Sequence, residues 1–346
     1  YAHDADSGTL IPLDLPPALD PLALASGISP DGKRLLVRAG ELEALTDLGF
    51  YLIEDPWQPA EKITALLSEQ LIADILAERG KQPKMALQAV LQPNPVSWTA
   101  NSRQAVFPLA LEDLSSDLYL YNPQAGTFKR LSERFQQEFA PLWAPGQNWL
   151  VFQEVNSYAT PDEWKISLVG AWKMPKQDEL RYLFEPKATG NWEHYVGWLT
   201  PEELVSYTTT ETGDTHLHLS NLGTGKSVVL FYGAFNSVAL DPAHGSIAVS
   251  VNSAEGKIGG RKPGIYFSKS GGLLFYLLME GEFEHLEFAP EVGHFIATGK
   301  SGVLQFDGNG ILARLEADQR ISFSPDGKWA IGWGTNGARL YYADGM

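Results

Sequence analysis

The sequence contains no cysteine, and that absence excludes several kinds of chemistry. Without thiols the chain can form no disulfide framework, no thiolate metal site and no cysteine nucleophile. Long apolar runs are missing as well. No stretch reaches the roughly 20 residues that cross a bilayer, and no basic segment followed by an apolar one marks a signal peptide. We therefore expect no transmembrane segment, and a fold held by core packing and backbone hydrogen bonds.

Positive charge is the second shortage. Lys and Arg number 26 against 42 Asp and Glu, which gives a formal net charge of −16. Such a surface repels phosphates, so we expect no nucleic-acid partner. Because 44% of the residues are hydrophobic and only 20% are charged, the chain can bury a large core. The chain starts at Tyr1, as a processed or trimmed protein would, and we predict export (periplasmic, cell-surface or secreted), with a cytoplasmic location left open.

The phrase SPDGK occurs near both ends of the chain, at residues 29–33 and 324–328. Weaker copies of the surrounding segment recur between them. Each copy has an apolar strand, a turn rich in Pro, Asp and Gly, and an alternating strand, which is the pattern of a β-hairpin. The copies are ISPDGKRLLV (28–37), VSWTANSRQAVFPLA (96–110), PLWAPGQNWLVFQEV (141–155), VGWLTPEELVSYTTT (196–210), VALDPAHGSIAVSV (238–251), LEFAPEVGHFIATG (286–299) and SFSPDGKWAIGWG (322–334).

A second pair of strands follows most copies, as in DLYLYNPQAGTFKRLS (117–132) and HLHLSNLGTGKSVVL (216–230). The turns are spaced by 70, 45, 56, 41, 48 and 35 residues, which brackets the roughly 40–50 residues of a four-stranded propeller blade. The sequence therefore predicts an all-β, seven-bladed β-propeller of four-stranded antiparallel blades in a single domain, 1–346. The predicted blades are 20–64, 94–132, 139–186, 195–231, 235–279, 285–317 and 319–346.

The last predicted blade ends at its third strand, ARLYYADGM. Residues 5–15 match the end of a third strand that leads into a fourth, so we predict that this N-terminal strand closes the last blade and covers its open edge. An eighth blade lost upstream remains an alternative, because Tyr1–Asp4 also resembles a third strand.

The SPDGK turns, the third strand DLYLYN and the fourth-strand endings KRLS and EKIT resemble the TolB-type, WD-repeat-like propeller repeats of bacterial envelope and secreted proteins. The resemblance covers nearly the whole chain and implies the propeller fold. It leaves the activity open, because the family includes interaction modules, propeller domains of serine peptidases and some polysaccharide lyases.

One amphipathic helix is predicted at 64–80, TALLSEQLIADILAERG, between the first two blades. Leu67, Leu71 and Ile75 share one face, Thr64 is the expected N-cap and Gly80 the expected stop. We expect the apolar face to pack on the propeller; the alternative is an exposed helix that docks a partner.

The predicted insertions lie in the loops between second and third strands and between blades, which emerge on one face of a propeller, so we expect function there. Aromatic residues on this face suit a sugar or a peptide, and basic residues suit an anionic group or an acidic segment. The alternatives are packing between blades for the aromatic residues and a solvated loop for the basic ones. The candidate binding residues are Tyr158, Trp164, Trp192, His194, Tyr195, Lys257, Arg261 and Lys262.

Motifs for catalysis, metals and cofactors are weak. LGTGKS (222–227) lacks the first glycine of a phosphate-binding loop, because Ser220 occupies that position. His216 and His218 share one strand face, and we interpret them as a structural pair rather than metal ligands. No G-x-S-x-G motif occurs. We expect no metal and no cofactor.

The sequence thus favours a non-enzymatic propeller that binds a protein, peptide or glycan partner through its loop face. Two alternatives stay open. One is a carbohydrate-active hydrolase or lyase with its site at the mouth of the central channel, and the other is a propeller domain of a larger protein.

Overall fold

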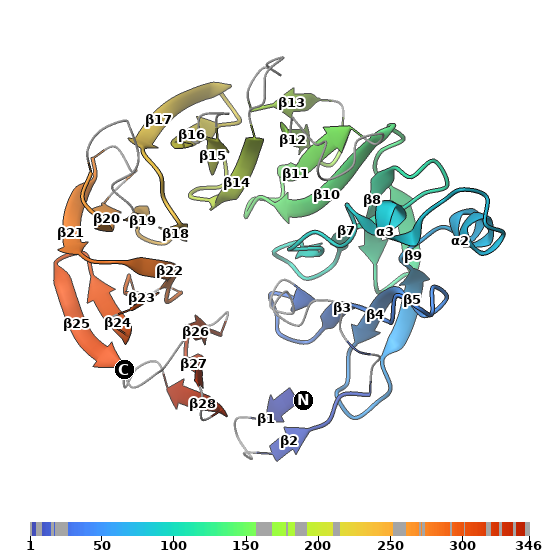
Figure 1. The fold of residues 1–346 in the computed structure, drawn as a ribbon, viewed down its shortest axis with the longest axis horizontal. Helices are drawn as coiled ribbons and strands as arrows, with labels where there is room; N and C mark the ends of the chain where they lie inside the picture. Colours follow the sequence, from blue (N-terminus) through green and yellow to red (C-terminus); the bar gives the residue numbers. More distant parts are fainter. Residues whose placement is uncertain are drawn as a thin grey trace. The chain divides into compact units, whose positions relative to one another are not determined.

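The chain forms two compact units, Tyr1–Pro186 (unit 1) and Lys187–Met346 (unit 2), in the computed structural model (Figure 1). The structure describes residues 2–4, 9–14, 17, 27–156, 168–177, 179–183, 192–209, 215–251, 261–269, 271, 274–290, 293–300, 302–315, 320–324, 327–334 and 337–342.

Unit 1 contains consecutive antiparallel sheets whose strands follow chain order. Ser116 of β8 and Gln137 of β10 form a parallel bridge that joins two of these sheets edge to edge. The first sheet has β3 (Leu35–Ala39), β4 (Gly49–Ile53) and β5 (Glu61–Ala65). The second has β6 (Ser97–Trp98), β7 (Ala105–Ala110), β8 (Ser116–Asn122) and β9 (Thr127–Arg130). The third has β10 (Gln136–Trp143), β11 (Trp149–Asn156), β12 (Leu168–Lys173) and β13 (Leu180–Tyr182).

Unit 2 repeats the same pattern, again with strands in chain order and neighbours antiparallel (Figure 1). Its first sheet has β14 (Trp192–Trp198), β15 (Glu203–Thr209), β16 (Thr215–Asn221) and β17 (Lys226–Tyr232). The next two have β18 (Ser237–Asp241), β19 (Ser246–Val251), β20 (Gly264–Ser268) and β21 (Tyr276–Glu280), then β22 (Phe283–Phe288), β23 (Phe295–Gly299), β24 (Gly302–Asp307) and β25 (Gly310–Leu315). The last has β26 (Arg320–Phe323), β27 (Trp329–Gly334) and β28 (Gly337–Tyr342).

The buried core lies between consecutive sheets of each unit. In unit 1, Leu36 and Phe50 of the first sheet share a cluster with Phe107 of the second. In unit 2, Phe267 of one sheet stacks on Phe295 of the next at 5.8 Å. Alternate side chains of a strand point to opposite faces, so each inner sheet supplies a core on both sides. This stacking of four-stranded meanders is the blade pattern predicted from the repeats.

The repeated turn is closed by one hydroxyl. Ser29 donates its Oγ–H to Asp31 Oδ1 (2.6 Å), accepts the N–H of Arg34 (2.9 Å) and is fully buried. Gly32 has φ +67°, in the left-handed region that favours glycine. Thr99 and Ser324 accept the same backbone N–H bond in their copies, both at 3.0 Å. The turn motif read from the sequence is therefore a shared hydrogen-bonded structure.

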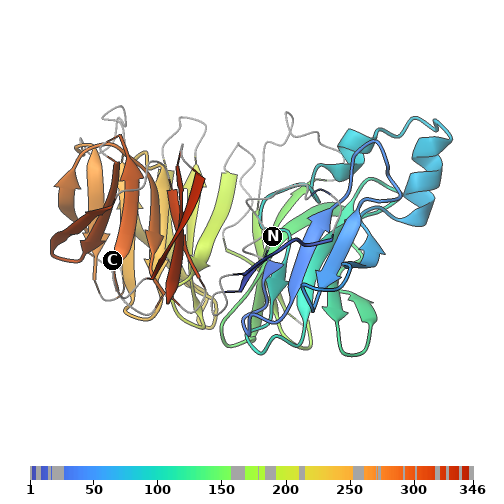
Figure 2. The same cartoon turned by 90° about the horizontal axis from the view of Figure 1, so that it is seen from below.

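The predicted helix is shorter than expected and is followed by a second one. α2 spans Glu69–Leu76, and Ser68 caps it by accepting the N–H of Leu71 at 3.2 Å. The N-cap prediction at Thr64 is wrong because that residue pairs within β5, opposite Phe50. α3 (Pro83–Leu87) was not predicted. Both helices lie at one end of the strands of unit 1 (Figure 2).

The expected packing of the helix on the sheets is confirmed, because Leu67 and Leu71 are buried in the same cluster as Phe50 and Phe107. The described residues contain no helix long and apolar enough to cross a membrane.

The N-terminal strand pairs differently from the prediction. β2 (Thr9–Ile11) forms a two-stranded hairpin with β1 (Ala2–Asp4), which the sequence analysis did not predict. The sequence match that pointed to the last blade also fits a local hairpin, which closes over a much shorter loop. Downstream, the Ala60 N–H donates to the Asp14 carbonyl in unit 1.

The closing hydroxyl yields the first prediction. Ser29→Ala should lower the free energy of unfolding by about 1–2 kcal/mol, because it removes two hydrogen bonds at a buried site. The fold should survive, since Ala144 occupies the equivalent position of the third copy with backbone bonds alone. Urea unfolding measures the change, with Lys33→Ala, an exposed position of the same turn, as the control. Equal midpoints for the two variants would contradict the role of the hydroxyl.

Candidate functional site

The loop end of each unit is the end where second strands finish and third strands begin. In unit 2, β14 starts at this end, so its first residues lie beside the last residues of β15: Trp192 pairs with Thr209, and His194 with Tyr207. Arg261 and Lys262 precede β20 at the same end. Of the predicted site residues, Tyr158, Trp164 and Lys257 lie outside the described residues.

Trp192 and His194 begin a run of neighbouring rings that we call the aromatic series: Trp192, His194, Tyr207, Phe235 and Phe231. Successive ring centroids are 6.4, 5.0, 5.4 and 6.5 Å apart. The first four side chains are half-buried. Burial lowers the pKa of the His194 imidazole, which keeps this ring neutral at pH 7.

Arg261 lies at the far end of the series. Its guanidinium carbon is 4.1 Å from the centroid of the Phe231 ring and 5.2 Å from that of Tyr266. Such a cation over two aromatic faces is held by their quadrupoles. The structure therefore connects His194 and Arg261, which are 67 residues apart in the sequence, through rings that were not predicted.

The other two predicted residues do not join the series. Tyr195 follows His194 on β14 and so points to the opposite face, where burial raises the pKa of its phenol. Lys262 forms an ion pair with Glu280 of β21, and the hydrogen bond from this ammonium to Glu280 raises the pKa of Lys262. The predicted basic loop is thus reduced to Arg261 among its described members.

The histidine pair on β16 is packed within its sheet. His218 is buried and lies 3.2 Å from the Thr208 hydroxyl, while the His216 ring meets the Tyr232 ring edge-on. Burial, and then the nearby His216, lower the pKa of His218 to about 4. The described residues contain no group of three or more His, Asp or Glu placed to hold a metal ion. These contacts fit the structural interpretation of the pair.

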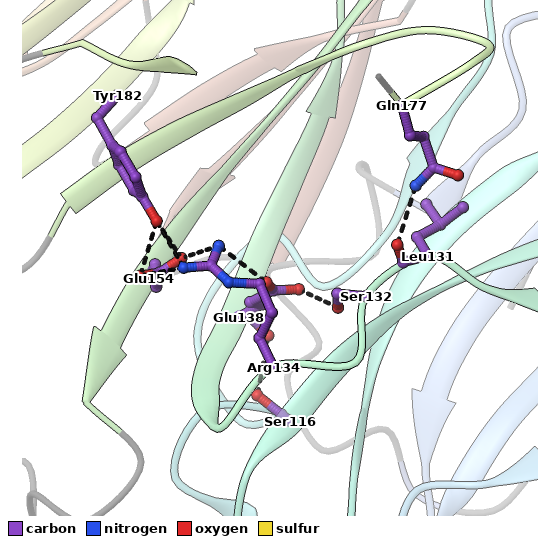
Figure 3. A network of polar contacts seen from close by, with 8 residues as sticks. All are labelled: Ser116, Leu131, Ser132, Arg134, Glu138, Glu154, Gln177 and Tyr182. Atoms are coloured by element: carbon purple, nitrogen blue, oxygen red, sulfur yellow. Dashed lines mark hydrogen bonds and ion pairs between the residues drawn. The ribbon is translucent and has the colours of Figure 1, made fainter. Parts of the chain in front are cut away.

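Unit 1 holds a buried polar network at its loop end that the sequence analysis missed (Figure 3). Arg134 pairs with Glu154 at 2.6 Å and donates to the Tyr182 hydroxyl at 2.6 Å. Glu138 lies opposite Glu154 in the β10–β11 pair and accepts a hydrogen bond from Ser132. We call these five residues the carboxylate network: Ser132, Arg134, Glu138, Glu154 and Tyr182.

The network ties the second sheet to the third. Ser116 of β8 donates to the Glu138 carbonyl of β10 at 2.9 Å, beside the parallel bridge that joins the sheets. Asp117, the next residue of β8, pairs with Arg130 of β9. Three ion pairs therefore meet at a single junction: Arg130 with Asp117, Arg134 with Glu154, and a longer contact of 3.7 Å between Arg134 and Glu138.

Glu138 is the exceptional acid of the network. It is fully buried, and its Oε1 has no hydrogen-bond partner within the described residues. Burial raises its pKa to about 8, and the charge of Asp117 acts in the same direction, although Ser132 opposes the shift. The group is therefore mostly protonated at pH 7. Its described contacts lie within the sheet junction, where Ser132 donates a hydrogen bond to it.

A hollow of about 570 Å³ lies at the opposite end of unit 1, at the β12–β13 turn. It is lined by Lys173, Met174, Pro175, Lys176 and Glu179. Lys173 and Arg181 both pair with Glu179, so part of the positive charge is already neutralised. The hollow contains no residue predicted for the site.

Comparison with solved structures identifies the fold. Dipeptidyl peptidase 4 from Porphyromonas gingivalis superposes with a TM-score of 0.62 and 10% identity, over 92% of this chain and 50% of that chain, so this protein spans half the length of the peptidase. An oligogalacturonate lyase from Vibrio parahaemolyticus matches with a TM-score of 0.57 and 11% identity, over 98% of this chain and 94% of that chain.

TolB from Acinetobacter baumannii matches with a TM-score of only 0.44 and 9% identity, over 82% of this chain and 64% of that chain. No sequence family and no curated protein matches. The antiparallel four-stranded sheets and the two matches with TM-scores above 0.5 confirm the β-propeller fold implied by the repeats, and identities this low show the fold alone.

The carboxylate network predicts a pH dependence. The unfolded Glu138 carboxyl loses its proton near its ordinary pKa of 4.5, whereas the folded one keeps it to about 8. The folded state binds the extra proton between these values, so the free energy of unfolding should fall as pH rises through this range. Glu138→Gln should make that fall smaller, although burial also raises the pKa of Asp117 and Glu154, and the variant should exceed the parent protein in stability by about 1–3 kcal/mol near pH 8.

Urea unfolding at about pH 5 and about pH 8 measures this difference. Glu133→Gln is the matched control, since Glu133 is an exposed acid of the same loop. If Glu138→Gln kept the full pH dependence of the parent protein, the claim that the folded state holds Glu138 as a neutral carboxyl would be refuted.

Proposed function

We propose that this protein is a seven-bladed, single-domain propeller that acts without catalysis and binds a protein, peptide or glycan partner through the loop end of unit 2. The observation that carries the proposal is the aromatic series, which continues from Trp192 on β14 to Phe231 on β17 and meets Arg261 there. Half-buried aromatic and arginine side chains are the residues that dominate recognition surfaces.

Support also comes from how these side chains are held. Trp192, His194 and Tyr207 belong to paired strands, and Arg261 is fixed on two rings. A partner would therefore meet a surface that needs little ordering on binding. Packing between blades explains contacts such as Tyr207 on Phe235, but it leaves the position of Arg261 at the end of the series unexplained.

The carbohydrate-active alternative has less support. Hydrolases and lyases need acids that reach the substrate, whereas Glu138 is enclosed and Glu154 is paired with Arg134. Because this chain spans half of the peptidase that it resembles in fold, a propeller domain of a larger protein stays compatible with the binding role. Export of the protein also remains part of this proposal.

Trp192→Ala tests the proposal. Parent and variant would be compared on peptide and glycan arrays and in capture from a bacterial envelope extract. We expect the variant to lose at least about tenfold in affinity for the ligands of the parent, because an anchoring aromatic side chain is removed.

Trp57→Ala is the control, since Trp57 is 67% exposed on the β4–β5 turn of unit 1 and is not a member of the aromatic series. The variant should keep the binding of the parent. Ligands that bind parent and Trp192→Ala equally, or the absence of any ligand, would refute the proposed surface.

A further inference from the structure

Arg261 differs from the other buried and half-buried arginines of the described residues. Each of the others has a carboxylate or carbonyl acceptor: Arg34 has Glu54, Arg38 the carbonyls of Val90 and Gln92, Arg134 has Glu154, and Arg181 has Glu179. Arg261 has neither an ion pair nor a hydrogen bond within the described residues. It has only the faces of Phe231 and Tyr266.

Among the residues that the structure describes, the guanidinium donors of Arg261 have no acceptor. The rings satisfy one flat face of the group, but its five N–H bonds lie in the plane and need acceptors. β21 pairs with β20, the strand that Arg261 precedes, and its one acid is Glu280. Glu280 is paired with Lys262 instead. Half-burying a cation without an acceptor costs free energy, and an external carboxylate would offset that cost with two parallel charge-assisted hydrogen bonds.

We propose that Arg261 receives a carboxylate on a peptide segment of a partner protein, and that the half-buried rings of the aromatic series contact an aromatic or aliphatic side chain of the same segment. This inference rests on the proposed function and specifies its ligand. The net charge of −16 repels polyanions at long range, so one local guanidinium selects a segment with a single acidic residue rather than an acidic tract.

Ring geometry favours a peptide over a sugar. His194 and Tyr207 stack at 5.0 Å and 30°, so each covers part of a face of the other, whereas Trp192 lies parallel to His194 with 6.4 Å between the ring centroids. The remaining face of Phe231 lies under Arg261. A sugar ring needs an open aromatic face, whereas half-buried rings suit the edges and faces of peptide side chains.

The test uses a library of capped pentapeptides that each contain one Glu and one aromatic residue, and a matched library with Gln in place of Glu. We expect the intact protein to enrich Glu peptides over their Gln counterparts. For enriched peptides, Arg261→Gln should weaken binding about tenfold or more, as for the loss of a charge-assisted pair. Arg261→Lys should recover only part of the affinity, because lysine lacks the planar pair of donors.

Lys262→Gln is the matched control. It removes the same charge from the adjacent position, but that charge is already paired with Glu280, so binding should stay within about twofold of the parent. Equal losses in the two variants would show a long-range charge effect and overturn the inference. Equal enrichment of Glu and Gln peptides, or enrichment of neither at about 1 mM, would also overturn it.

The failure of this inference and the failure of the proposed function give different results. Neutral peptides or glycans that bind the parent, lose binding in Trp192→Ala and ignore Arg261→Gln would keep the recognition surface and refute the carboxylate. Ligands insensitive to Trp192→Ala would refute the surface itself. Thermal unfolding of every variant shows whether a loss of binding reflects a loss of fold.

Discussion

A sheet of four short strands has two apolar faces, and neither is stable in contact with water. Each sheet therefore has to pack a neighbouring sheet against both faces, and the architecture follows from this requirement. Within each unit the buried clusters bridge one sheet and the next, as Phe107 does between Phe50 and Tyr121, and burying a side chain of this size contributes about 1.5–3 kcal/mol. A unit that is stable only when stacked has to be repeated, and each repeat must turn its first strand back within a few residues. The hydroxyl-closed turn at Ser29, Thr99 and Ser324 meets that need.

The junctions between sheets differ in how they are covered. Where Phe267, Phe295 and Phe306 meet, the contact is apolar and indifferent to pH. Where the second and third sheets of unit 1 meet, part of the junction is polar and consists of the carboxylate network. Glu138 stays neutral there only because it is enclosed. Enclosed ion pairs such as Arg134–Glu154 stabilise a structure less than apolar packing would, but they restrict which partners fit. We infer that the polar junction fixes the register of β8 against β10 rather than adding stability.

The fold was largely readable from the sequence because its signals are local. The tight turn and the alternating strand are each written in a few consecutive residues. They recur at intervals of 35 or more residues, which reveals the repeat. The errors arose where local signals competed: Thr64 looks like a helix cap, yet it extends a strand whose partner is Phe50. The candidate site was only half readable. Trp192 and Arg261 were predicted as binding residues because they are an aromatic and a basic residue in predicted loops. Tyr207, Phe231 and Phe235 were missed because in the sequence they resemble ordinary strand residues. The carboxylate network offered one signal, an acid inside each of two consecutive strands, at Glu138 and Glu154.

The same constraint explains why the candidate surface lies at strand ends. Side chains in the middle of a blade strand are needed for covering the next sheet, so recognition has to use the first or last residues of strands, where one side is open. Trp192 and His194 are the first and third residues of β14, and Tyr207 faces them from the end of β15. Backbone pairing holds these residues in place, while the loops beyond them can differ in length at little cost in stability. A propeller can thus change its partner by altering strand ends such as these without altering the cores that keep its sheets together.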